Sequence, residues 1–554
     1  MSLQLIIGSS GSGKSRRLYD QLIAQAMAHP QENFIVIVPE QYTMQTQRNI
    51  VELHPNHGIM NIDIVSFGRL AYRVFSETGQ VPAGVLEDTG KRMVIRKILE
   101  QKKKSLQVFS GSVRKSGFSG ELKSMVSELL QYNIAPDQLE QCLPLLGEKS
   151  VLYGKLHDLN IVYQGFKEYI EGHYLTAEEI LDVLCTVIDQ SDVIKNSWIY
   201  VDNFSGFTPS QYHLLEDLLR LSRGVFMTLT IDCDEDPYNM GHDYELFYLT
   251  RQTLHRLEAV CRQSGTHRLD DIFMRVGEDG VNTRFEGALD LLWLEKNIYR
   301  QRMTSYEGIP EHMICREGKT PMDEADDVAR TIRRMVRDEG LRYREIAVVT
   351  GDLSGYRHIL EKAFEAMEIP CFIDVKRSIL NNAFVESIRA LLEMLAENFN
   401  YEGVFRYMRS GFCGIGAHDV DLLENYVLAM GIRGASGWRG TWIKRPAGVD
   451  DGDLLMLNQL REAVFEKIWP VYDIFKDGHS TVSECTQVLM QWIQDMNMER
   501  LLDEMRKAFE DRGELSMARE YAQVYAVVTE LLCQLEDILG DAVIGIREYT
   551  DILD

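Results

Sequence analysis

The segment that most constrains the fold of this chain is residues 8–15, Gly-Ser-Ser-Gly-Ser-Gly-Lys-Ser, directly behind the apolar run of residues 3–7. The glycines of this segment allow consecutive backbone N–H groups to curl around an anion without Cβ clashes. Residues 16–28 continue in a helical pattern, and such a helix directs the positive end of its dipole at the phosphate. The order strand, glycine loop and helix therefore predicts an α/β fold with a phosphate-binding loop.

The residue types in this loop suit a nucleoside triphosphate. Lys14 would reach the β- and γ-phosphates, and the Ser15 hydroxyl would ligate Mg²⁺. A serine-rich turn without a ligand is the alternative, and it requires the flanking strand and helix patterns to be coincidental. We expect ATP and Mg²⁺ as ligands, with the ATP contacts Gly8, Ser9, Ser10, Gly11, Ser12, Gly13, Lys14 and Ser15.

The charge balance limits how the chain can bind nucleic acid. It has 84 acidic and 59 basic residues among 554, a formal net charge of −25. Attraction of the whole molecule to nucleic acid is therefore excluded, and DNA binding needs a local basic or aromatic groove. No apolar run approaches the roughly 18 residues of a membrane span, and the N-terminus enters a strand directly. We expect a cytoplasmic protein without a membrane partner.

The nine cysteines are scattered along the chain. None belongs to a CxxC pair, and the closest two are 28 residues apart. This spacing argues against a zinc or iron–sulfur site built from local ligands, and it fits free thiols in a reducing compartment.

Strand and helix patterns divide the chain into alternating regions. Strand-length apolar runs at residues 3–7, 34–38, 62–66, 198–202 and 225–231 predict a parallel sheet. Further strands are expected at 312–315, 346–349 and 370–373. We predict a first P-loop lobe at 1–87 and 191–310, a helical insertion at 88–190, an incomplete second α/β lobe at 311–380 and a helical region at 381–554. This plan resembles the two RecA-like lobes of superfamily 1 helicases, each with a mainly helical insertion.

Polar and aromatic residues follow the second and third predicted strands. Gln41 and Thr43 come after the second strand, and Phe67, Arg69 and Tyr72 come after the third. The carboxyl ends of parallel strands meet at one edge, where ligands of α/β proteins bind. Stacking faces and a guanidinium are the groups that single-stranded DNA binding uses. Alternatively, Phe67 and Tyr72 are core aromatics and Arg69 is a surface charge.

The strand at residues 198–202 ends in an acidic residue. Asp202 then fits a Walker B carboxylate that holds Mg²⁺ through water, whereas the alternative is a strand that simply ends in a polar turn. An active helicase places a glutamate next to activate the attacking water, but this chain has Asn203, which cannot act as a base. We expect slow hydrolysis, and we assign no catalytic residue.

Together these segments resemble the AddB family, the B subunits of AddAB helicase–nucleases. Residues 8–15, 38–41, 66–74 and 201–209 carry the resemblance, and 423–427 match more weakly. It implies a decayed helicase motor that still binds ATP, pairs with an AddA-type subunit, binds single- and double-stranded DNA, and scans the single strand for a Chi-like signal during double-strand break repair. Carried over residue by residue, the scanning surface comprises Gln41, Thr43, Phe67, Arg69 and Tyr72, with Phe207 as a weaker candidate.

The resemblance also sets expectations about what lies elsewhere. The family's nuclease domain and four-cysteine iron–sulfur cluster belong to a C-terminal half that we do not find in this chain. An autonomous superfamily 1 helicase and a small-molecule P-loop kinase stay open as alternatives. Basic clusters could line a nucleic-acid path or be solvated helix faces; they are Lys102–Lys104, Arg333, Arg334, Arg337, Arg342 and Arg344.

Overall fold

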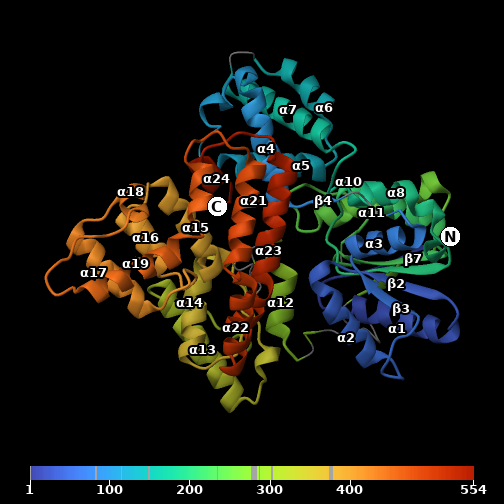
Figure 1. Ribbon diagram of the computed structural model, residues 1–554. Coiled ribbons are helices and arrows are strands. Elements are labelled where there is room, and N and C mark those ends of the chain that lie inside the picture. Colours follow the sequence, from blue (N-terminus) through green and yellow to red (C-terminus); the bar gives the residue numbers. More distant parts are fainter. Residues whose placement is uncertain are drawn as a thin grey trace.

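The computed structural model describes residues 2–553 except 81–83, 114, 116, 148–149, 234, 276–283, 286, 301–303 and 374–377. It is an α/β structure in which helices predominate (Figure 1).

A seven-stranded sheet forms the N-terminal part, and its strand pairs are parallel. The strand order is β3-β2-β6-β7-β1-β8, with β9 also paired to β1. The strands are β1 (Ser2–Gly8), β2 (Asn33–Ile37), β3 (Ile62–Val65), β6 (Ser197–Val201), β7 (Gly224–Thr230), β8 (His267–Arg268) and β9 (Ile272–Met274). The five strands expected in this region are confirmed to within one residue at each end. Because β6 and β7 come from far along the chain, the sheet is assembled from two separate stretches of sequence.

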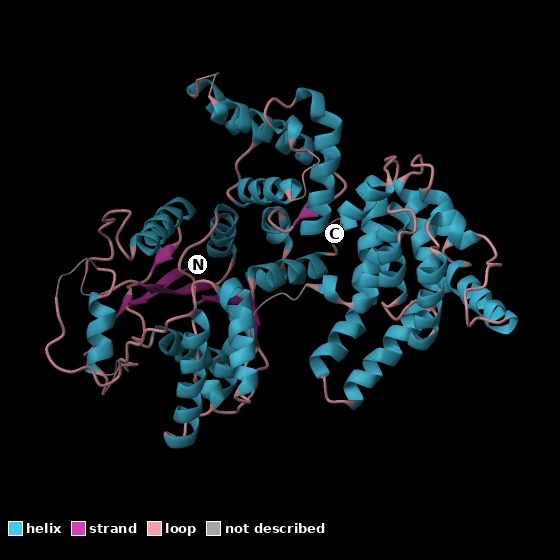
Figure 2. Cartoon of the chain, turned by 90° about the vertical axis from the view of Figure 1, so that its left-hand side faces the viewer, coloured by secondary structure: helices cyan, strands magenta, loops and turns pink. Residues whose placement is uncertain are grey.

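Helices cover both faces of this sheet, which Figure 2 shows as one layer between helices. Successive strand residues alternate between the faces, so Leu5 and Ile7 enter one core and Ile6 enters the other. One face is covered by α1 (Lys14–Ala28) and α2 (Thr43–Leu53). The other is covered by α3 (Phe67–Thr78), α8 (Ile180–Val187), α10 (Pro209–Leu221) and α11 (Tyr248–Ser264).

A second, larger core joins helices from two distant parts of the sequence. Residues 88–170 contribute α4 (Asp88–Lys102), α5 (Phe118–Gln131), α6 (Pro136–Cys142) and α7 (Val151–Ile170); the short strands β4 (Val85–Leu86) and β5 (Leu175–Thr176) and helix α9 (Asp192–Lys195) lie near them in sequence. The C-terminal part contributes α15 (Ala383–Ala396), α16 (Tyr401–Met408), α17 (Ala417–Met430), α18 (Gly434–Arg439), α19 (Asp451–Phe465), α20 (Trp469–Phe475), α21 (Val482–Asp495), α22 (Met498–Asp511), α23 (Leu515–Leu539) and α24 (Ile546–Leu553). Buried residues of both sets belong to one hydrophobic cluster.

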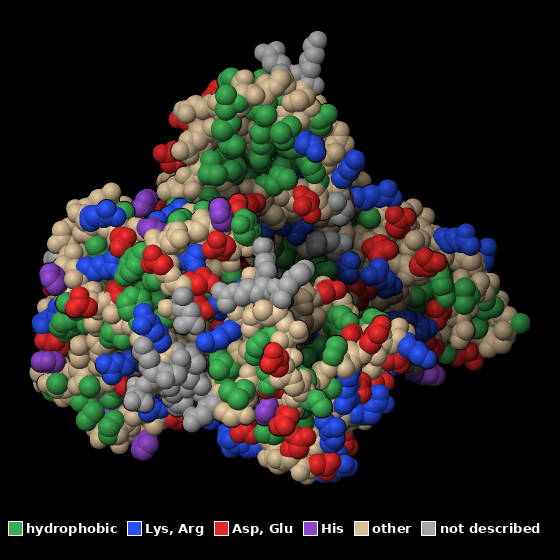
Figure 3. Space-filling view, turned by 180° about the vertical axis from the view of Figure 1, so that it is seen from behind, with side chains coloured by type: hydrophobic (Ala, Val, Ile, Leu, Met, Phe, Trp, Pro, Cys, Tyr) green, Lys and Arg blue, Asp and Glu red, His purple; other side chains and the backbone are tan. Residues whose placement is uncertain are grey.

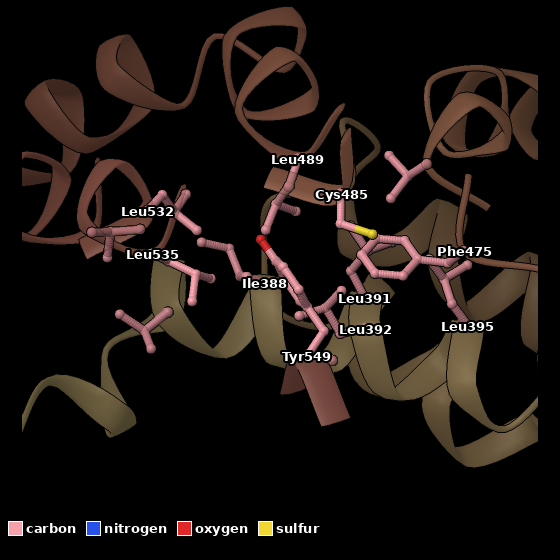
Figure 4. Packing of buried hydrophobic residues seen from close by; sticks show 14 of the residues in the cluster. Ile388, Leu391, Leu392, Leu395, Phe475, Cys485, Leu489, Leu532, Leu535 and Tyr549 are labelled. Carbon is pink, nitrogen blue, oxygen red and sulfur yellow. The ribbon is translucent and has the colours of Figure 1, made fainter. Parts of the chain in front are cut away.

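Close packing in the C-terminal part of that cluster is visible in Figure 4. Leu391 of α15, Leu489 of α21 and Leu535 of α23 surround the Tyr549 side chain of α24, and Leu395 of α15 lies beside Phe475. The Tyr549 hydroxyl shares a 2.8 Å hydrogen bond with Thr486 Oγ1, which satisfies both buried groups. The insertion is tied to this part through Lys97, whose ammonium donates to the Ile538 carbonyl at 2.6 Å and lies over the Tyr169 ring.

Between the sheet and the C-terminal helices in sequence lie α12 (Leu289–Asn297), α13 (Pro321–Asp338) and α14 (Leu353–Ala366). Helices α13 and α14 pack on each other through a small core of Ala325, Ala329, Ile332, Leu360 and Phe364. The strands expected at 312–315, 346–349 and 370–373 are wrong, because all three segments are described and carry no strand pairing. A short apolar run becomes a strand only when a neighbouring strand accepts its backbone hydrogen bonds, and the described residues supply none here.

The surface carries hydrophobic groups on the lobe of α4–α7. Figure 3 shows hydrophobic side chains together over the upper lobe, where Figure 1 places these helices. Exposed hydrophobic residues of this lobe include Met125, Tyr132, Leu145, Val151 and Leu152. Within the described ranges, we find no helix whose length and apolar character would let it span a bilayer.

Candidate nucleotide site and strand-end surface

The glycine loop follows β1 and leads directly into α1. Gly11 has φ +76° and Gly13, the N-cap of α1, has φ +88°, a conformation that L side chains rarely adopt. A Cβ at Gly8 would lie 2.4 Å from Ser12 Oγ, so a side chain does not fit there either. The Ser12 hydroxyl is buried and has no hydrogen-bond partner in the described structure. The loop is thus a backbone cradle with spare donors at a helix N-terminus, which is the geometry that phosphate oxygens require.

Lys14 lies at the first position of α1 and is buried. Its ammonium donates to the Ser9 carbonyl at 2.8 Å, which folds the side chain back over the loop. Burial lowers the pKa of Lys14 from 10.5 to about 8, and the carboxylate of Asp202 opposes this shift. A buried cation with a single neutral partner is costly, so an anion in the loop would be a strong partner for it.

Asp202 sits at the carboxyl end of β6 and is 1% exposed. Its Oδ1 accepts from Ser15 Oγ at 3.1 Å and from Thr228 Oγ1 at 2.5 Å, and its Oδ2 accepts from the Tyr19 hydroxyl at 2.6 Å. Burial, followed by the Asp202 carboxylate, raises the pKa of Tyr19, so this tyrosine remains a donor. The structure therefore brings Ser15 and Asp202 together from positions 187 residues apart in sequence.

The oxygen atoms of Ser15 and Asp202 form a pair of hard donors suited to Mg²⁺. Because both Asp202 oxygens are already engaged by protein donors, the carboxylate fits contact with a metal through water rather than direct ligation. No group of three or more His, Cys, Asp and Glu side chains with metal-binding geometry occurs in the described part of the chain.

Asn203 follows Asp202 in a left-handed backbone conformation, with φ +65°. Its side chain is exposed, and its Nδ2 donates to Asp202 Oδ2 at 3.3 Å. The amide points its donor at the carboxylate and supplies no basic oxygen that could take a proton from water.

Several groups around the loop are not apparent from the sequence motifs. The pKa of Lys14 also responds to Cys233, Glu295 and Arg284. The backbone N–H of Arg284 donates to the Gly11 carbonyl at 3.1 Å, so Arg284 lies against the loop. Burial and the nearby Asp232 raise the pKa of Glu295. The sequence could have indicated that Tyr19 lies beside the site, because Ser15 and Tyr19 are four residues apart on one helix face.

The strand-end surface lies where β2 and β3 end side by side. Arg69 Nε is 3.3 Å from Glu40 Oε1, and Ser66 Oγ donates to Glu40 Oε2 at 3.3 Å. These contacts join the segments that follow the two strands. Gln41, Arg69 and Tyr72 are exposed, the tyrosine at 49%. Three of the predicted DNA contacts therefore present their side chains to solvent near one edge of the sheet.

The other predicted DNA contacts point inward. Phe67 is 5% exposed and packs against Phe204 and Phe207 with ring-centroid distances of 5.3 and 6.2 Å. Thr43 is also 5% exposed, and its hydroxyl donates to the Glu40 carbonyl. Phe207 is half-buried. In this arrangement Phe67 and Thr43 support the surface from below and offer no stacking face or free hydroxyl to a ligand.

Two exposed apolar side chains beside Gln41 were missed by the sequence motifs. Tyr42 is 42% exposed and Met44 is 73% exposed. Tyr42 ends the turn between β2 and α2, and Met44 is the second residue of α2. The buried residues Thr43, Thr46 and Ile50 of α2 are spaced at i, i+3 and i+7, and Met44 lies off this stripe.

Comparison with known proteins gives consistent matches. A family model described as "ADDB, N-terminal" matches residues 5–295. The whole chain aligns at 38% identity with the B subunit of the ATP-dependent helicase/deoxyribonuclease of Lachnoclostridium phytofermentans, covering 48% of that protein. Proteins of the same name match at 34% in Symbiobacterium thermophilum (49% covered) and at 31% in Caldanaerobacter subterraneus subsp. tengcongensis (48% covered). The chain spans about half the length of the curated relatives it matches.

Proposed function

This chain belongs to the AddB family, and from that membership and the loop geometry we propose that it is the nucleotide-binding, DNA-contacting part of one subunit of a helicase–deoxyribonuclease. The observation that carries the proposal is the buried Lys14 ammonium inside a glycine cradle, with Ser15 and Asp202 3.1 Å apart beside it. In this role it acts with an AddA-type partner in the resection of double-strand DNA breaks.

ATP binds across the loop of Gly8–Ser15. Backbone N–H groups around Gly11 and Gly13 hold the phosphate oxygens, and Lys14 leaves the Ser9 carbonyl to meet the β- and γ-phosphates. Ser15 would hold Mg²⁺ directly, and Asp202 would hold it through water. A bound Mg²⁺ neutralises phosphate charge, while the chain's own groups fix where the phosphates lie.

Turnover is slow because the position after Asp202 is occupied by an amide. The chain thus works as a decayed motor, in which ATP binding stabilises a conformation more than it drives movement. An autonomous superfamily 1 helicase would need a base at this position.

The strand-end surface scans single-stranded DNA for a Chi-like signal. Gln41 and Arg69 read base edges, Tyr72 stacks on a base, and the buried Phe67 and half-buried Phe207 hold the surface in shape. Phe67 and Thr43 contact DNA themselves only if the strand binds with a local rearrangement.

The remaining expectations complete this proposal. The seven-stranded sheet, which lacks β4 and β5, corresponds to a first RecA-like lobe, and α13 and α14 correspond to part of a second. The family resemblance implies that the nuclease domain and its iron–sulfur cluster belong to the other part of the relatives, of which this chain covers about half.

The nucleotide site is tested by equilibrium binding of labelled ATP with Mg²⁺. Lys14→Ala should weaken binding at least about a hundredfold, because a charged hydrogen-bonding partner of the phosphates is lost. Arg16→Ala is the matched control, since Arg16 is exposed and pairs with Asp20 at 3.0 Å. Equal binding by both variants would remove the loop from the nucleotide site.

The scanning surface is tested with the AddA-type partner present, using Chi-like and scrambled oligonucleotides at fixed salt. Tyr72→Ala should weaken single-strand binding by about 1–3 kcal/mol for most sequences. Gln41→Ala and Arg69→Ala should mainly erase the preference for one sequence. Tyr132→Ala removes a similarly exposed tyrosine from the end of α5 and serves as control. Retained discrimination in both polar variants would contradict the scanning assignment.

A further inference from the structure

The second half of helix α13 concentrates positive charge in an acidic molecule, although the whole helix, residues 321–338, has five acidic and four basic residues. Its second half holds Arg330, Arg333, Arg334 and Arg337, and the following turn adds Arg342 and Arg344. Only three acidic residues, Asp338, Glu339 and Glu345, lie in residues 330–345, which leaves this stretch with a net charge of +3 in a chain of −25.

The four helix arginines share one face. They are spaced at i, i+3, i+4 and i+7, whereas Ala325, Ala329 and Ile332 on the opposite face are buried against α14. The same four arginines line a hollow of about 380 Å³ together with Ala366, Met367 and Glu368 at the end of α14. The helix is thus fixed by its apolar side with the arginines directed outward into a shared depression.

Local partners do not account for this charge. Arg330 makes no hydrogen bond or ion pair with any residue that the structure describes. Arg334 Nε is 4.0 Å from Glu339, and Arg337 pairs with its exposed neighbour Asp338. Arg333 donates to the neutral Tyr343 hydroxyl at 3.0 Å. Exposed pairs of this kind contribute little stability, so the guanidinium groups are available to an external anion.

The arginines that line the hollow, and the lack of an aromatic ring among its described lining residues, indicate which ligand it suits. Arginine forks match phosphate oxygens, and the eight helix residues from Arg330 to Arg337 rise about 10 Å, the axial length of roughly three phosphates of one strand of a duplex. The residues lining the hollow include no aromatic ring among those described, so it lacks the stacking platform typical of single-strand sites.

We propose that this arginine face of α13 binds the phosphate backbone of duplex DNA without reading its sequence. The proposal goes beyond the scanning surface and rests on the proposed function only in taking DNA as the ligand. It separates two tasks: the strand-end surface engages unpaired bases, and α13 holds the duplex by charge alone.

The test measures binding of the full chain to a 20-base-pair duplex and to a single-stranded oligonucleotide over a series of salt concentrations. Arg330→Ala with Arg334→Ala should lower the slope of log K against log salt by about 2 for the duplex, because about 0.9 counterion is released per phosphate contact. The loss at 0.1 M salt should be about tenfold or more, equal for different duplex sequences, and small for the single strand. Lysine at both positions should restore most of the slope.

The matched control is Arg500→Ala with Arg512→Ala, which removes the same charge from exposed positions on or just after α22. Duplex binding by the α13 variant equal to that of this control would overturn the proposal while leaving the proposed function intact. Unchanged duplex binding with loss of polyglutamate binding would assign the face to an acidic protein and would also overturn it. A wild-type chain that binds ATP but no DNA would overturn the DNA part of the proposed function itself.

Discussion

At the scale of single residues, Lys14 links the structure to a measurable pH dependence. Its pKa is lowered to about 8 by burial, and bound phosphates would raise it again. Binding of ATP above pH 8 must then take up a proton, so affinity falls as pH rises. We expect ATP affinity to drop about 25-fold between pH 7 and 9.5. This figure follows if the pKa of Lys14 is about 8 in the free protein and returns to its ordinary value of 10.5 in the ATP complex.

Calorimetry in two buffers of different ionisation enthalpy measures this proton uptake directly. Lys14→Arg is the control, because arginine stays charged over this range and its profile should be flat. A wild-type profile as flat as that of the arginine variant would contradict the assigned role of Lys14.

The second residue-scale prediction concerns Asn203. Glu and Gln at this position have the same size and the same strain in the left-handed backbone, so they differ only in basicity. If the missing carboxylate limits turnover, Asn203→Glu should hydrolyse ATP at least about tenfold faster than Asn203→Gln. This factor is smaller than the roughly hundredfold or greater rate increase that a well-positioned general base contributes. Steady-state phosphate release checks this, and identical rates would show that the limitation lies elsewhere.

Sequence patterns predict which side chains of the strand-end surface are buried, but they do not predict the contacts around Asp202. The spacing Phe67, Leu70, Ala71, Val74 is an apolar helix stripe, and Tyr72 lies off it. That periodicity alone indicates a buried Phe67 and an exposed Tyr72. The hydrogen bond from Thr228 to Asp202 was not predictable, because it depends on β6 and β7 being neighbours in the sheet.

At the scale of elements, the cap of α10 gives a stability prediction. Thr208 Oγ1 accepts from the Gln211 N–H, the Gln211 side chain accepts from the Thr208 N–H, and Pro209 occupies the first helical position. Thr208→Ala should lower the free energy of unfolding by about 1 kcal/mol, whereas Thr208→Ser should be close to neutral. The urea midpoint followed by circular dichroism measures the difference, and equal midpoints would mean that the cap is dispensable.

Two regions were predicted to be α/β, residues 1–87 with 191–310 and residues 311–380, and only the first contains the predicted strands. In β1, β2 and β6 the apolar run is buried on both faces and each strand has a parallel partner, so the local pattern and the tertiary pairing agree. Residues 346–349 have the same local pattern, but strand formation depends on partners that sequence periodicity does not reveal. The helices α13 and α14 were predictable because their hydrogen bonds are internal.

At the scale of the whole molecule, one core unites the insertion with the C-terminal helices while the sheet has separate cores. Leu535→Ala truncates a fully buried side chain of the shared core and should lower the free energy of unfolding by about 2–5 kcal/mol. ATP binding at moderate temperature should survive, because the loop rests on the sheet. Leu428→Ala, at a 59% exposed leucine, should change stability by less than about 0.5 kcal/mol. Thermal melting with an ATP-binding assay checks both, and parallel loss of the two would contradict separate cores.

The unpaired stretches beside α13 and α14 have a consequence for how copies of the chain behave in concentrated solution. Val349 is 91% exposed and Phe372 is 87% exposed, and both lie in segments that form no helix or strand and pair with no described strand. Such apolar edges act as templates onto which another molecule can add a strand. Light scattering should therefore rise with concentration, and the charged gatekeepers Val349→Lys and Phe372→Lys should suppress that rise while leaving ATP binding unchanged. The same edges would then set the highest concentration at which the purified chain can be stored without forming aggregates.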